Sequence, residues 1–226
     1  MDREWRITPE KFLNRKELTA LLARADELRV MGEAKGRSQL IRDWMIIETF
    51  IFTGLRRKEV SDLRCVDFRI FGGNCHLLVR HGKGGKPRHV HLPKGYAKDV
   101  RWYLKWKAGR GEIQDSDAYF LRTERSGKYF PSGIYKRWKK YCPNHRLPAA
   151  RHTHATALYE APKSLRLVQK QLGHASIGTT QVYADVTAEQ SIAGMTAMER
   201  MMHSPAGRPR MAVESVEPEE AVAVPA

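Results

Sequence analysis

Apolar residues recur with a helical period over most of the chain, beginning in the segment 14–30. This segment opens with Asn14 and carries Glu17 three positions later, which is the asparagine form of a capping box. The apolar side chains that follow are spaced three or four residues apart, at Leu18, Leu21, Leu22, Ala25 and Leu28. The spacing predicts an amphipathic helix that starts just after Asn14.

A second segment, residues 40–54, is apolar on nearly every side and reads "LIRDWMIIETFIFTG". A helix that is apolar all round belongs inside a protein, so this segment is expected to lie in the core. Gly54 marks its end, because glycine readily adopts the left-handed conformation that terminates helices. Residues 57–64 resume a short helix after that break.

Between residues 65 and 92 the pattern changes to the two-residue alternation of β-strands. Gly72 and Gly73 precede one alternating run, and the glycine-rich segment 82–87 separates it from the next. These features predict a small antiparallel hairpin or a three-stranded sheet. Helical spacing then returns in segments that cover 95–109, 132–142, 150–161, 165–174 and 187–203.

Together these elements predict a mainly α fold with a small antiparallel β-sheet, of the α+β class, as one domain over residues 11–203. Residues 1–10 are interpreted as an N-terminal arm. Residues 204–226 are interpreted as a disordered acidic C-terminal tail, because they have no aromatic residue and no amphipathic period. The length of 226 residues, 42% of them hydrophobic, suits one domain of ordinary size with a core.

The chain is strongly basic, since 40 Lys and Arg residues against 25 Asp and Glu residues give a formal net charge of +15. This excess favours a polyanionic partner, with nucleic acid as the first candidate, over a charge that only aids solubility. Cys65, Cys75 and Cys142 form no CxxC pair, which argues against a disulfide framework and against a cysteine-built zinc site. No cofactor is expected.

The compartment is predicted from what the sequence lacks. No uninterrupted apolar run approaches the ~20 residues that cross a bilayer. The N-terminal segment "MDREWRITPEK" is charged and unlike a signal peptide. The expected location is therefore the cytoplasm, in association with the nucleoid and with no membrane partner.

Four motifs follow one another along the chain: "FTGLRRKEVSDLRCVDF", "GKGGKPRHVHLP", "ARHTHAT" and "LGHASIGTTQVYADV". In this order they resemble the catalytic domain of the tyrosine recombinase (phage integrase) family, and the resemblance covers roughly residues 12–190. It implies the fold of that domain. It also implies metal-independent cleavage and rejoining of DNA strands through a 3′-phosphotyrosyl intermediate, as in site-specific recombination or integration.

Cleaving a phosphodiester without a metal requires a nucleophile, cationic donors for the nonbridging oxygens and an acid for the leaving 5′ oxygen. Arginine suits the second task because its planar fork binds phosphate bidentately, so Arg56 and Arg151 are the predicted clamp. Tyr183 is the predicted nucleophile. By the resemblance, His174 donates a hydrogen bond to the scissile phosphate and Lys83, in the turn between strands, is the general acid.

Two neighbours of these groups are given other roles. Lys86 is the alternative acid, and either lysine is also suited to contact the DNA backbone. Glu59, one turn after Arg56, is expected to hold the structure of the site rather than to take part in the chemistry.

One position departs from the family pattern: Pro148 stands where a histidine is expected, three residues before Arg151. His145 is the candidate replacement, and a water molecule or no group at all are the alternatives. General-base help is worth ~10² to 10⁴ in rate, so its loss would slow a reaction driven mostly by electrostatics without abolishing it. His152 and His154 do not share a helix face, so no metal site is expected.

Further basic residues are predicted to contact DNA. Segments 101–110 and 135–141 mix aromatic and basic residues, which suits either a DNA-backbone face or an amphipathic helix with its tryptophans inward and its lysines and arginines outward. The predicted DNA-binding residues are Arg57, Lys86, Arg88, Lys136, Arg137 and Lys139.

The resemblance also implies partners. These are double-stranded DNA recombination sites, a homo-tetramer assembled on DNA, and accessory DNA-bending or host proteins. The segment 188–203 is expected to pack on a neighbouring protomer or within its own domain. Since the catalytic pattern starts near residue 12, a stand-alone catalytic domain without a preceding core-binding domain is expected. The alternatives are a DNA-binding protein or regulator that has lost activity, and a type IB topoisomerase.

Overall fold

The computed structural model describes residues 12–82, 85–124, 127–161, 164–173 and 188–202. The helices are α1 (Arg15–Ala34), α2 (Ser38–Thr53), α3 (Arg57–Asp62), the 3-10 helix η2 (Cys65–Asp67), α4 (Lys94–Gly109), α5 (Pro131–Tyr141), α6 (Leu147–Glu160), α7 (Leu165–Leu172) and α8 (Ala188–Met202). The strands are β1 (Phe68–Arg69), β2 (His76–Val79) and β3 (Arg88–His91). The predicted fold class, mainly α with a small antiparallel sheet, is confirmed. The predicted arm and tail lie outside the described residues.

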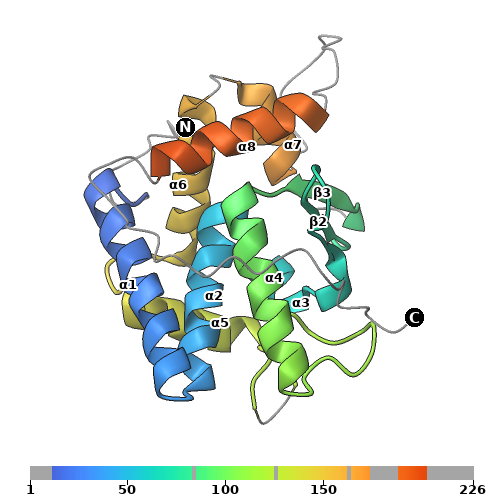
Figure 1. Cartoon of the computed structure of the whole chain (residues 1–226). Helices are drawn as coiled ribbons and strands as arrows, with labels where there is room; N and C mark the ends of the chain where they lie inside the picture. The colour runs from blue at the N-terminus through green and yellow to red at the C-terminus, as the bar shows by residue number, and fades with distance from the viewer. Residues whose placement is uncertain (1–11, 83–84, 125–126, 162–163, 174–187, 203–226) are drawn as a thin grey trace.

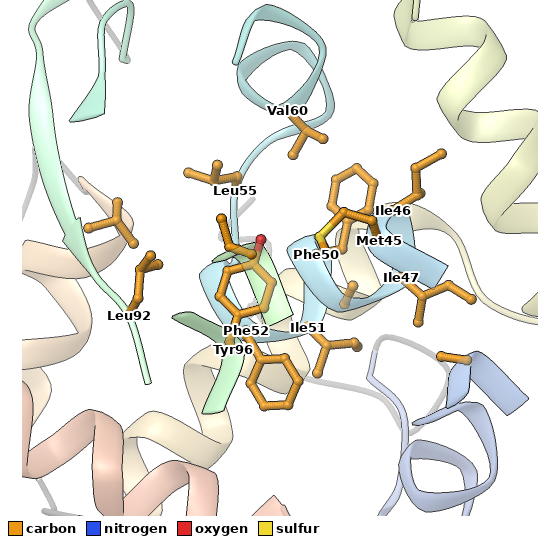
Figure 2. Close-up of a cluster of buried hydrophobic side chains, with 14 of the residues drawn as sticks. Met45, Ile46, Ile47, Phe50, Ile51, Phe52, Leu55, Val60, Leu92 and Tyr96 are labelled. Atoms are coloured by element: carbon orange, nitrogen blue, oxygen red, sulfur yellow. The ribbon is translucent and has the colours of Figure 1, made fainter. Parts of the chain in front are cut away.

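Helix α2 lies at the centre of the domain, with α1, α4, α5 and α6 packed around it (Figure 1). Every residue from Ile41 to Thr53 is buried, which confirms the core position predicted from its apolar sequence. Figure 2 shows this cluster, in which Phe50, Phe52 and Ile51 project from α2 toward different neighbours. Burying one such side chain contributes ~1.5–3 kcal/mol, so α2 anchors the elements that carry the site.

Helix α1 begins where the capping box predicted, with Glu17 N–H donating to Asn14 and Asn14 N–H donating to Glu17. It continues past the predicted end to Ala34. The extension passes through Gly32, where an added Cβ would lie 2.6 Å from Ile41 Cγ1. The glycine is thus a point of close approach between α1 and α2, although it lowers helix propensity.

The sheet is three-stranded and antiparallel, with the order β1-β2-β3. This result decides between the two arrangements that the sequence left open. Leu77 of β2 pairs with Val90 of β3, and both side chains are buried on the core face. Strand β3 is one of the two edge strands of this sheet, and α7 packs against it (Figure 1).

The expectation that lysines and arginines of segment 101–110 point outward is wrong for Lys107. Its side chain is 0% exposed, and Nζ donates to the carbonyl of Tyr119 at 2.9 Å and lies 3.5 Å from Glu112 Oε2. Burial lowers the pKa of Lys107, and the carboxylate of Glu112 opposes that change. Glu112 also accepts from Arg42 of α2 at 2.6 Å. Lys107, Glu112 and Arg42 thus form a buried network of charges, whereas Lys107 was expected to be exposed to solvent. Trp138 points into the core as predicted.

Candidate active site

Arg151 lies between the C-terminal ends of two helices. Its Nη1 donates to the carbonyl of Gly54, just after α2, at 2.7 Å, and its Nη2 donates to the carbonyl of Leu172 of α7 at 2.7 Å. Both helices end in a left-handed glycine, Gly54 at φ 60° and Gly173 at φ 64°. Helix C-termini carry partial negative charge, so these carbonyls orient and stabilise the guanidinium.

The position of Gly54 depends on its lack of a side chain. An added Cβ would lie 2.7 Å from the ring of His154 and 2.9 Å from the side chain of Leu172, in a conformation that other residues rarely adopt. Gly54 was interpreted from the sequence only as a helix stop. That its carbonyl accepts from Arg151 could not be read from the sequence, because the two residues are 97 positions apart.

The Arg151 guanidinium keeps donors for an anion, because only two of its N–H groups are used by the carbonyls. Burial lowers the pKa of Arg151 to about 10, and the nearby charges of Arg56 and Arg88 act in the same direction while Glu59 opposes them. Arg151 therefore remains cationic at neutral pH.

Glu59 joins two further arginines beside Arg151. Arg56 donates to its carboxylate through the backbone N–H at 2.7 Å and through Nη1 at 3.0 Å. Arg88, from β3, donates through both terminal nitrogens, at 2.8 and 3.0 Å. These bonds confirm the structural role that the sequence predicted for Glu59.

The carboxylate of Glu59 is ionised despite its burial. Burial by itself raises the pKa of Glu59, but the hydrogen bonds from Arg88 and from the Arg56 backbone outweigh it, and the net shift is downward. One negative charge thus stands among three guanidiniums, those of Arg56, Arg88 and Arg151. The cluster keeps a net positive charge, and the side chain of Arg56 is 35% exposed, so it is suited to bind a phosphate from solution.

His154 lies three residues after Arg151 on α6 and contacts α2 near Gly54. It is fully buried, and its Nδ1–H donates to the carbonyl of Ile51 of α2 at 2.9 Å. Burial lowers the pKa of His154 from 6.5 to about 4, so the folded protein holds it neutral.

The stability of the domain is therefore expected to fall as the pH drops below 6.5, because the unfolded chain then binds a proton that buried His154 does not accept until about pH 4. This contribution amounts to at most about 1.4 kcal/mol per pH unit. It would be measured from urea unfolding at several pH values in the wild type and in His154→Leu. Equal pH slopes in the two proteins would contradict the assignment.

Of the predicted catalytic residues, the structure places Arg56 and Arg151 and brings them to one cluster. Lys83, His174 and Tyr183 lie outside the described residues. Among the described residues near Lys83, Gly82 N–H donates to the carbonyl of Lys86 at 3.0 Å. The roles of Lys83, His174 and Tyr183 stay predictions.

The candidate base His145 is bound by a carboxylate of another helix. Its ring Nε2 lies 3.1 Å from Glu17 Oε1, and this hydrogen bond is the main reason why the pKa of Glu17 is lowered. His145 thus ties the chain before α6 to the first turn of α1. Pro148 occupies the first turn of α6, where backbone N–H groups have no helical partner, so proline is well tolerated there.

Two of the predicted DNA-binding residues, Arg88 and Arg137, form ion pairs within the protein. Arg88 binds Glu59, and Arg137 donates through Nε to Asp43 of α2 at 2.6 Å. The side chain of Asp43 is 0% exposed, so its charge requires a partner, which Arg137 supplies. The DNA-binding roles of Arg88 and Arg137 stay predictions. Arg57, Lys86 and Lys136 are exposed, and half-buried Lys139 donates to the carbonyl of Pro143.

The described part of the chain contains neither a metal-ligand cluster nor a membrane-spanning helix. Within these ranges, no group of three His, Cys, Asp or Glu side chains is placed to hold a metal ion. Among the described helices, none is both long enough and apolar enough to cross a membrane.

A helical domain with a three-stranded antiparallel sheet is the fold of the tyrosine recombinase catalytic domain. Residues 11–190 match the Phage integrase family, and the chain belongs to that family. The resemblance noted in the sequence is thereby confirmed.

Individual relatives agree with this assignment. Tyrosine recombinase XerA of Pyrococcus furiosus is 34% identical over 158 residues, which covers 66% of this chain and 52% of that protein. The crystal structure of the XerH site-specific recombinase bound to its difH substrate has 25% identity and a TM-score of 0.62, covering 74% of this chain and 48% of that one. The integrase of mycobacterium phage Brujita shares the fold, with a TM-score of 0.61 at 18% identity, covering 87% of this chain and 60% of that one. The chain spans about half the length of the curated relatives it matches.

Proposed function

We propose that this protein is a site-specific DNA recombinase that cuts and rejoins strands through a covalent bond between Tyr183 and a 3′-phosphate, without a metal ion. The observation that carries the proposal is the arginine cluster. Arg56 and Arg151 come from separate helices and meet around Glu59, inside the segment that matches the family.

In the proposed reaction, Arg56 and Arg151 donate hydrogen bonds to the nonbridging oxygens of the scissile phosphate. The phenol oxygen of Tyr183 attacks phosphorus and loses its proton, while the bond to the 5′ oxygen breaks and Lys83 protonates that oxygen. Lys86 is the alternative acid, and His174 donates to the phosphate. A 5′-hydroxyl from another strand then attacks the phosphotyrosine, which restores the DNA backbone and releases the tyrosine.

The arginines supply most of the rate enhancement in this scheme. Fixed donors aimed at a developing negative charge are worth ~10² to 10³ in rate each, because they need no reorganisation when the charge appears. Arg151 meets this requirement, since two helix ends hold its guanidinium in place. The ring of His145 is hydrogen-bonded to Glu17. We therefore propose that water removes the phenol proton, and that the reaction is slower because Pro148 stands where the family has a histidine.

The proposed partner is a pair of double-stranded DNA sites, bound by a tetramer of this chain with accessory DNA-bending proteins. A formal net charge of +15 attracts DNA and makes the affinity fall steeply with salt concentration. The exposed residues Arg57, Lys86 and Lys136 are the proposed contacts to the DNA backbone.

The test is covalent trapping. Duplexes that the wild-type protein selects from a library with a randomised centre are nicked beside the candidate cleavage position, so that cleavage releases a short strand and cannot reverse. We expect a protein–DNA adduct that resists SDS, with a nucleotide remnant on the peptide that contains Tyr183. Specific binding to the selected duplex without any adduct would refute the proposed function.

A further inference from the structure

The side chain of Gln171 replaces a missing strand at the edge of the sheet. Gln171 is 1% exposed, near the end of α7. Its Oε1 accepts from the backbone N–H of His91 at 2.9 Å, and its Nε2 donates to the carbonyl of the same residue at 3.1 Å. His91 is the last residue of the edge strand β3, so the amide occupies the place of a neighbouring strand.

This pairing requires an amide side chain. His91 is 9% exposed, so its N–H and C=O would be buried without partners if Gln171 were apolar. Glutamine presents one donor and one acceptor at the end of a side chain, as a neighbouring peptide unit would, whereas a carboxylate only accepts. The contact joins residues that are 80 positions apart, and it fixes the end of α7 on the sheet.

The same helix end holds two arginines of the site. Arg151 Nη2 donates to the carbonyl of Leu172 at 2.7 Å, and Arg88 Nε donates to the carbonyl of Gln171 at 3.3 Å. Arg88 also packs over Gly173, where an added Cβ would lie 2.7 Å from Arg88 Cδ. A shift of α7 along the sheet would therefore move the acceptor that orients Arg151.

We propose that Gln171 is a positioning residue, which sets the orientation of the Arg151 guanidinium by holding the end of α7 on strand β3. The inference rests on the proposed function, because it assigns Arg151 to the scissile phosphate. Gln171 itself touches no reacting atom in this scheme.

The test compares Gln171→Leu with Gln169→Leu, which makes the same chemical change at a half-buried position of the same helix. The first-order rate of adduct formation on the selected nicked duplex, at saturating DNA, is expected to fall about 10²-fold in Gln171→Leu, the cost of a misplacement of about 1 Å. The dissociation constant for DNA is expected to stay unchanged. Gln169→Leu is expected to cleave at the wild-type rate. A wild-type rate in Gln171→Leu would overturn the inference.

A double-mutant cycle separates positioning from a general structural defect. In an Arg151→Lys background, the guanidinium that donates to the carbonyl of Leu172 is absent. Gln171→Leu is therefore expected to reduce the rate of adduct formation little further. A loss of the same size in both backgrounds would show that Gln171 acts through another group, and would overturn the inference.

Hydrogen exchange tests the geometry without any cleavage. The amide of His91 is expected to exchange faster in Gln171→Leu than in the wild type, while amides of α2 keep their protection. Unchanged exchange at His91 would overturn the inference. If the wild type forms no adduct at all, the proposed function fails, and this exchange result still decides whether Gln171 holds α7 on β3.

Discussion

Replacement of Arg151 by lysine is expected to slow DNA cleavage by about 10³-fold, the upper range for losing a fixed donor to a developing charge. The guanidinium binds the carbonyls of Gly54 and Leu172 at the same time, each at 2.7 Å, and still has N–H groups for the phosphate. Lysine has a single nitrogen on a flexible stem, so it cannot bond both helix ends and the phosphate in one geometry. The positive charge of the lysine is therefore expected to recover little of the cleavage rate that is lost with the guanidinium.

The measurement is the single-turnover rate of adduct formation with the nicked duplex in excess. Arg29→Lys is the matched control, since Arg29 is also a largely buried arginine, 12% exposed, that pairs with Glu33 and Asp99 away from the arginine cluster. It is expected to react at the wild-type rate. An Arg151→Lys protein that folds and reacts within tenfold of the wild type would contradict the assigned role of the Arg151 fork.

Replacement of Tyr183 by phenylalanine is expected to eliminate the covalent adduct completely while DNA binding stays intact. The substitution removes only the phenol oxygen, which is the atom that forms the bond to phosphorus in the proposed reaction. The free phenol has an ordinary pKa near ~10, so its attack depends on the cationic cluster around Arg56 and Arg151. Both variants are thus expected to affect the chemical step rather than the affinity.

The control for this change is Tyr159→Phe, because Tyr159 is an exposed tyrosine of α6. Gel-shift affinity and SDS-resistant adduct would be measured for each protein on the same duplex. An adduct that persists in Tyr183→Phe would assign the nucleophile to a different residue, and equal loss in Tyr159→Phe would point to a defect in folding.

Local patterns were sufficient for most of the secondary structure. Asn14 and Glu17 marked the start of α1, Gly54 marked the end of α2, and the two glycine-rich turns bounded the strands of the sheet. These signals act between residues a few positions apart, which is why a single sequence displays them. The motifs around Arg56 and Arg151 likewise singled out two arginines that the fold brings to one cluster.

The error concerns a charged residue whose partners only the folded chain identifies. Lys107 was expected on the surface and is buried, because Glu112 and the carbonyl of Tyr119 compensate for its charge. The DNA-binding role of Arg137 stays a prediction, but nothing in the sequence indicated its bond to Asp43, which is 94 positions away. Composition shows that the chain is basic, but it does not show which lysines and arginines form ion pairs with carboxylates inside the protein.

The sequence by itself determined the helices and the sheet, because periodicity and capping act between nearby positions. The resemblance of its four motifs indicated the family and the candidate catalytic residues. The tertiary structure alone decided how these residues are held. Arg151 is oriented by Gly54 and Leu172, Glu59 by Arg88, and the end of α7 by the bond between Gln171 and His91. Each of these contacts joins separate elements, and it exists only because packing around α2 brings their ends together.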